Sequence, residues 1–155
     1  MWICLLGVGW LCCLVIARQD FRQREIHVGP LLLFGLLGGI IRFREWGQVF
    51  WHFFLTNILV VAILLGTILL YFRIRGDAEV MDVKLGWGDI VMLLTLAAWM
   101  EPFNYLILYS LTTSILSLVY GLLRRYKRID AQYPIPLAGW LALAFGAWSI
   151  YGFIL

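Results

Sequence analysis

Long apolar runs separated by short charged segments make up almost the whole chain, and this alternation constrains the fold more than any single residue does. Hydrophobic residues account for 63% of the 155 residues, and charged residues account for only 14%. A soluble protein contains about 45–50% apolar residues. A chain of this length cannot bury so much apolar surface in its own interior, so lipid must solvate much of it. The sequence therefore predicts a membrane protein.

The apolar runs are long enough to form helices that cross or enter a bilayer. They are Trp2–Ala17, Val28–Ile41, Phe50–Phe72, Gly86–Glu101, Phe103–Leu123 and Tyr133–Leu155. We predict an all-α polytopic membrane protein with about six transmembrane helices. Without a long linker or a soluble segment between the runs, residues 1–155 are expected to form a single membrane-embedded domain. The eight tryptophans fit anchoring at the membrane interfaces.

The basic residues predict the orientation of these helices, because cytoplasmic loops of membrane proteins are enriched in lysine and arginine. With the N-terminus outside, the two outer turns hold only Arg42 and Arg44, and the inner loops hold the remaining ten of the 12 basic residues. The opposite orientation would reverse this ratio. We therefore expect both ends of the chain outside and the charged loops on the cytoplasmic face. Basic residues placed in this way are a topology signal and do not indicate binding of nucleic acid.

Two aspartates are expected to meet at this cytoplasmic face. Asp89 opens the fourth run, directly after Gly86 and Gly88, and Asp20 ends the first. An aspartate at the mouth of a membrane helix is costly to keep without a use. Two carboxylates held close together cannot both ionise cheaply, so one keeps its proton and the pair can serve as acid and base toward one water. Asp20 and Asp89 are therefore the predicted catalytic residues.

Plainer interpretations of these residues remain open. Asp89 could be only a cap for the first amides of its own helix, and Asp20 could be an interfacial charge paired with a neighbouring arginine. Gly86 and Gly88 favour the catalytic interpretation, because glycines let an extended substrate backbone approach the carboxylate. We therefore also predict Gly86 and Gly88 as substrate-binding residues.

The segment Gly86-Trp87-Gly88-Asp89 matches the GxGD signature of membrane aspartyl peptidases. Among these, the chain resembles the type IV prepilin peptidases and their archaeal preflagellin relatives. Two further stretches carry the resemblance. Asp20 is followed by a basic stretch, Ile26 and a second helix, and Ile135–Leu143 is similar to the proline-led start of the last helix in the family's catalytic region.

The resemblance implies six membrane helices and a catalytic dyad of Asp20 and Asp89. The implied reaction is cleavage of the short basic leader peptide from pilin-like precursors at the cytoplasmic face of the cell (inner) membrane, with no cofactor. His27 stands where the family usually has proline, and Val91 where bacterial members commonly have lysine. Neither change removes a carboxylate, so these departures bear on substrate preference and not on hydrolysis itself. The chain also lacks the insertion with paired zinc-binding cysteines that many bacterial members carry, so neither methyl transfer nor a metal site is expected.

The acidic residues Asp77, Glu79 and Asp82 lie in the same predicted cytoplasmic loop system as the dyad. They are candidates for attracting the basic leader of a substrate, although a solvated loop would show the same composition. Beside the peptidase, two other functions stay open: a relative that binds leaders without cutting them, and a small transporter subunit that uses Asp89 as a proton or cation site. The identity of the precursor and the oligomeric state do not follow from the sequence.

Overall fold

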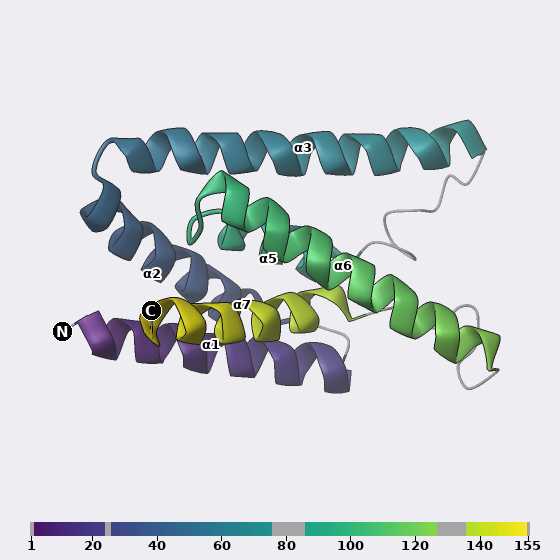
Figure 1. Ribbon diagram of the computed structural model, residues 1–155, viewed down its shortest axis with the longest axis horizontal. Coiled ribbons are helices and arrows are strands. Elements are labelled where there is room, and N and C mark those ends of the chain that lie inside the picture. Colours follow the sequence, from purple (N-terminus) through teal and green to yellow (C-terminus); the bar gives the residue numbers. More distant parts are fainter. Residues whose placement is uncertain (1, 24–25, 76–85, 127–135, 155) are drawn as a thin grey trace.

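The computed structural model describes residues 2–23, 26–75, 86–126 and 136–154. The described residues form six helices and no strand. The helices are α1 (Trp2–Gln23), α2 (Val28–Trp46), α3 (Val49–Arg75), α5 (Trp87–Leu96), α6 (Pro102–Arg125) and α7 (Leu137–Ile154). They lie roughly antiparallel in a bundle, with α1 and α7 side by side and α3 along the opposite edge (Figure 1). The predicted all-α fold is confirmed.

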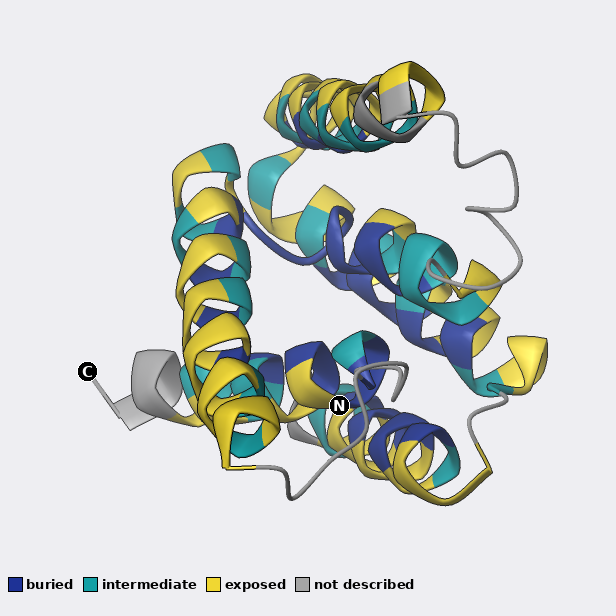
Figure 2. Cartoon of the chain, turned by 90° about the vertical axis from the view of Figure 1, so that its right-hand side faces the viewer, coloured by how far each residue is buried: buried dark blue, intermediate teal, exposed yellow. Residues whose placement is uncertain are grey.

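Three helical segments are long and apolar enough to cross a membrane, judged by length and composition. They are Cys4–Gln23, Val49–Leu70 and Pro102–Arg125. The segments Trp87–Leu96 and Leu137–Ile150 are apolar but shorter. Exposed residues cover the outward sides of the helices, and buried residues face the middle of the bundle (Figure 2). Many of the exposed side chains are large and apolar, such as Leu11, Leu36 and Leu59. These features fit a polytopic membrane protein whose outer surface contacts lipid.

Helices α1 and α2 extend furthest beyond the apolar runs, and α3 and α6 extend by fewer residues. α1 continues through the charged residues after Ala17 and ends at Gln23, so Asp20 lies inside the helix and not after it. Arginine and glutamine are good helix formers, and no glycine or proline interrupts this stretch. α2 likewise continues past Ile41 and ends at Trp46. Its C-cap residue is Gly47, whose φ is 55°. The apolar pattern underestimated both helices because polar side chains can extend a membrane helix at its end.

α5 is shorter than predicted. The apolar run extends to Glu101, but the helix ends at Leu96 and a turn leads into α6. At 1.5 Å per residue, its 10 residues measure about 15 Å, roughly half the thickness of a bilayer's hydrocarbon core. Figure 1 shows the turn after α5 lying short of the ends of the neighbouring α1 and α2. Hydropathy detects the apolar segment but not this early end, which depends on contacts with other helices.

Trp99, in the turn after α5, is a core residue. Its side chain is 1% exposed, it stacks on Phe34 with ring centroids 5.0 Å apart, and its indole N–H donates to the Phe34 carbonyl at 2.9 Å. The expectation that the tryptophans anchor the protein at the interfaces is therefore wrong for Trp99. The space for its ring comes from Gly38 of α2, where a Cβ atom would lie 2.5 Å from the indole.

Candidate active site

The first turn of α7 brings the two predicted aspartates together. The backbone N–H of Ala138 donates to Oδ1 of Asp89 at 2.8 Å, and the N–H of Gly139 donates to Oδ2 of Asp20 at 2.6 Å. These amides are consecutive, and the first four N–H groups of a helix have no partner within it. The helix N-terminus also favours negative charge. Two carboxylates that are 69 positions apart in the sequence are thus held side by side by one helical turn.

Asp20 is 6% exposed because the end of α1 packs against the start of α7. This close packing depends on Gly139, where an added Cβ would lie 3.0 Å from Oδ2 and 3.2 Å from the Cβ of Asp20. Phe21 and Trp140 pack edge-on beside the carboxylate, with ring centroids 5.4 Å apart. A buried carboxylate needs hydrogen-bond donors, and the Gly139 amide supplies one.

Asp89 lies in the first turn of α5, after Gly86 as the N-cap residue. The N-cap residue is a glycine and has no side chain to cap the first amides of α5. The Asp89 carboxylate accepts a hydrogen bond from the Gly86 amide of its own helix and another from the Ala138 amide of α7, and it lies close enough to Asp20 for their charges to interact. The geometry therefore favours the paired-carboxylate interpretation over a simple helix cap. Because each negative charge disfavours the other, ionising both carboxylates together costs free energy.

The two glycines before Asp89 have different surroundings. A Cβ on Gly86 would lie 3.5 Å from Oδ2 of Asp89, in ordinary contact with the carboxylate. A Cβ on Gly88 would lie 2.9 Å from the end of the Ile26 side chain, in the segment between α1 and α2. Gly88 therefore has a packing reason to lack a side chain, and its role toward a substrate stays a prediction. Asp77, Glu79 and Asp82 lie outside the described residues.

An apolar groove of about 620 Å³ runs along another side of α5, between α2 and α3. Its lining includes Val91, Leu94 and Thr95 of α5 and Gly35 of α2. At Gly35, α2 approaches α5 closely. A Cβ added there would lie 2.9 Å from the Thr95 side chain. In the described part of the chain, no group of three or more His, Cys, Asp or Glu residues could hold a metal ion.

Sequence reasoning did not identify the backbone amides that hold the carboxylates. Ala138 and Gly139 belong to the proline-led stretch whose resemblance to the family is noted above, but a backbone donor leaves no signature in residue type. Proline at position 136 was the available signal, because proline is favoured at the start of a helix, where the first amides have no partner within the helix. Asn57, Arg42 and Tyr105, which contact the other end of α5, were also missed.

Comparison with known proteins identifies the family of the chain. A sequence profile of the type IV leader peptidase family matches residues 7–122, which include both aspartates. No significant match was found among curated proteins or solved structures. The profile covers about three quarters of the chain, and its match includes the GxGD segment as well as Asp20. The chain belongs to the type IV leader peptidase family.

Proposed function

We propose that the chain is an aspartic endopeptidase that removes the short basic leader peptide from pilin-like precursors at the cytoplasmic face of the membrane. Membership of the leader peptidase family supports a protease of this general kind. The observation that carries the proposal is the pair of carboxylates on consecutive amides of α7. We assign the catalytic roles to Asp20 and Asp89, with the substrate backbone passing near Gly86 and Gly88.

The proposed mechanism needs only the two carboxylates and one water. One carboxylate is ionised and takes a proton from the water, which attacks the scissile carbonyl carbon. The other is protonated and donates its proton to the carbonyl oxygen, which gives a gem-diol. When the gem-diol collapses, the first group passes the water-derived proton to the leaving amine, and the second takes a proton back from a gem-diol hydroxyl. The α7 amides contribute by fixing one oxygen of each carboxylate, so that the pair is oriented before the substrate arrives. Both groups return to their starting protonation states when the products leave.

The surroundings of the site support a substrate that is partly embedded in the membrane. The dyad lies at the ends of apolar helices, and the apolar groove beside α5 begins near Val91, within one turn of Asp89. A basic leader followed by an apolar segment would place charge at the membrane surface and apolar side chains within lipid. No residue described here indicates the identity of the precursor.

The test is cleavage of a membrane-embedded precursor with a basic leader, in lipid, by the parent protein and by single Asp20→Asn and Asp89→Asn variants. We expect each variant to lose between about a hundredfold and about ten-thousandfold of the rate. Glu101→Gln is the matched control, because it removes a carboxylate at the far end of the α5 segment. Cleavage by either aspartate variant at the parental rate would contradict the dyad assignment.

The same assay tests the proposed role of Asp77, Glu79 and Asp82. Neutralising all three as amides should raise KM for a basic leader and weaken the dependence of cleavage on salt concentration, because electrostatic attraction is screened by salt. A precursor with a neutral leader is the control and should respond little. Unchanged KM and unchanged salt dependence would remove these residues from the proposed substrate site.

A further inference from the structure

The C-terminal end of α5 lies in the bundle interior and is held by side chains from three other helices. A helix end leaves its last carbonyls without partners in the helix, and within lipid each unsatisfied group is costly. Tyr105 of α6 donates from its hydroxyl to the carbonyl of Leu93 at 3.3 Å. Arg42 of α2 donates from Nε to the carbonyl of Trp99 at 2.8 Å. Both donors reach α5 or the turn that follows it.

Asn57 of α3 makes the most central of these contacts. Its side chain is 0% exposed, and its Nδ2 donates to the carbonyls of Ala97 at 3.0 Å and Met100 at 2.8 Å. Both partners are acceptors, so only the amide NH₂ group can satisfy them. Its Oδ1 accepts no hydrogen bond from any described residue. Burying Asn57 with its Oδ1 unsatisfied costs free energy. The two hydrogen bonds that its NH₂ group donates matter because they offset part of this cost.

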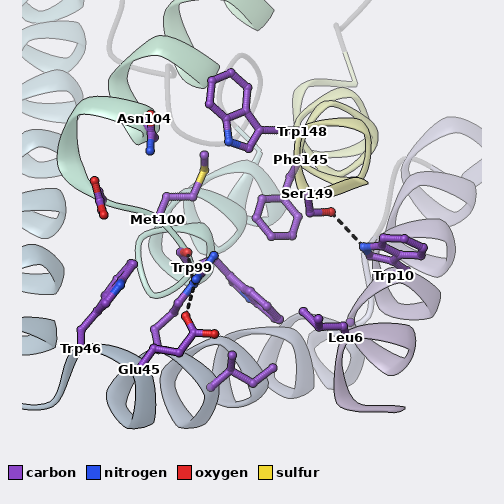
Figure 3. Close-up of a pocket in the computed structure, with 14 residues that line it drawn as sticks. Leu6, Trp10, Glu45, Trp46, Trp99, Met100, Asn104, Phe145, Trp148 and Ser149 are labelled. Atoms are coloured by element: carbon purple, nitrogen blue, oxygen red, sulfur yellow. Dashed lines mark hydrogen bonds and ion pairs between the residues drawn. The ribbon is translucent and has the colours of Figure 1, made fainter. Parts of the chain in front are cut away.

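A cavity of about 390 Å³, lined by both polar and apolar side chains, opens beside this turn. Figure 3 shows Trp99 and Met100 lining it together with Glu45 of α2 and Ser149 of α7. Arg42 forms an ion pair with Glu45, and its guanidinium carbon lies 4.9 Å from the ring centroid of Trp46. The side chain that binds the Trp99 carbonyl is therefore itself held in place on two sides.

We propose that Asn57 and Arg42 are positioning residues for the dyad. α5 is a helix of 10 residues with Asp89 in its first turn, and the bound carbonyls of Ala97, Trp99 and Met100 lie at its C-cap and in the turn that follows. Fixing the far end sets the depth and rotation of the helix, and these determine whether Asp89 reaches the Ala138 amide. A displacement of about 1 Å in a reacting group can cost about a hundredfold in rate. The inference rests on the proposed peptidase function for its kinetic consequence only.

The principal variant is Asn57→Leu, which removes both donors and keeps a similar side-chain size. We expect kcat to fall between about tenfold and about a hundredfold, with KM nearly unchanged, because the substrate site itself is intact. Thr56→Ala is the matched control. Thr56 precedes Asn57 on α3, is exposed, and bonds only to the carbonyl of His52 in its own helix. The control should retain parental kcat and KM.

A second readout does not depend on peptidase activity. An ideal Cβ at Gly88 would lie 3.4 Å from the Cβ of Ile26, a separation close to that of disulfide-bonded cysteines. Gly88→Cys with Ile26→Cys, in a background with Cys4, Cys12 and Cys13 replaced by alanine, therefore reports where α5 begins. We expect Asn57→Leu to slow formation of this disulfide and Thr56→Ala to leave its rate unchanged.

The two readouts separate failure of this inference from failure of the proposed function. If the parent cleaves no leader-bearing precursor, the proposed function fails, and the rate of disulfide formation still decides the positioning role. Unchanged kcat and unchanged disulfide formation in Asn57→Leu would overturn the inference. Where Asn57→Leu folds, a parental kcat per molecule of folded protein would overturn it as well, since Asn57 would then have a purely structural role.

If Asn57→Leu does not fold, Arg42→Met provides the same test at the edge of this cavity. It removes the hydrogen bond to the Trp99 carbonyl together with the ion pair. Glu45→Gln is its control, because it removes the charge of the ion-pair partner and leaves Arg42 able to bind that carbonyl. The positioning role requires slower disulfide formation in Arg42→Met and a parental rate in Glu45→Gln, and equal rates in both would overturn it.

Discussion

The two ends of α5 are held by opposite kinds of hydrogen bond. At the N-terminal end, an acidic side chain accepts from a backbone amide of α7. At the C-terminal end, backbone carbonyls accept from the side chains of Asn57 and Arg42. The first arrangement places a reactive group where another element can orient it, and the second satisfies and fixes the backbone at the end of α5 and in the turn that follows. Changes at the first end should therefore act mainly on the rate of cleavage. Changes at the second end should lower folding stability and also, through the position of α5, the rate.

The largest effect is expected when both carboxylates of the dyad are changed. Asp20→Asn and Asp89→Asn should each lower the cleavage rate between about a hundredfold and about ten-thousandfold. The double variant should lose little more than either single variant, because the two groups act as one unit. Single-turnover cleavage by the three variants, with unfolding followed in parallel, tests this expectation. Losses that multiply in the double variant would show that the aspartates act independently.

Trp99→Ala should have the largest effect on stability at the other end of α5. Removing a buried aromatic side chain costs about 3–5 kcal/mol, and here the hydrogen bond to the Phe34 carbonyl is also lost. Denaturant unfolding in detergent measures the change. Trp51→Ala is the control, since that side chain is 49% exposed, and it should cost much less. Equal losses in the two variants would mean that Trp99 is not the core residue of this end.

A smaller change at the same end is Gly38→Ala. The new Cβ would lie 2.5 Å from the Trp99 indole, so the ring or α2 must shift. Overpacking of this kind costs about 1–3 kcal/mol, and unfolding in detergent should show the loss. Gly66→Ala is the control on α3, because no atom lies within 4 Å of its added Cβ. A Gly38→Ala protein as stable as the parent would contradict the tight packing of α2 against the turn.

The smallest effect is expected for Gly139→Ala, at the dyad itself. Its Cβ would press on Asp20 from 3.0 Å, a contact that a shift of a few tenths of an ångström relieves. We expect cleavage to slow by about tenfold while stability changes little, because the perturbation acts on orientation. Gly146→Ala on the same helix has open space around its Cβ and should cleave at the parental rate. A loss of stability without a loss of rate would reverse the comparison between the two ends.

The sequence predicted which two carboxylates meet better than it predicted which groups hold them. The apolar runs located each of the six helices that the described residues form, since hydropathy and length are local properties. The GxGD segment and Asp20 identified the two carboxylates that the structure brings together. The predicted helix ends were less accurate. Polar side chains extend α1 and α2 beyond their apolar runs, and tertiary contacts end α5 before its apolar run does.

Tertiary structure alone decided which groups bind the two carboxylates and the end of α5. The donors to Asp20 and Asp89 are backbone amides, which every residue except proline carries, so residue identity cannot reveal them. Asn57 was visible in the sequence as one amide side chain in a long apolar run, but its partners lie 40 and 43 positions away. The sequence by itself determined that the chain forms apolar helices with two carboxylates at their ends. The packing of those helices determined which backbone groups were left without a partner, and hence which side chains had to satisfy them.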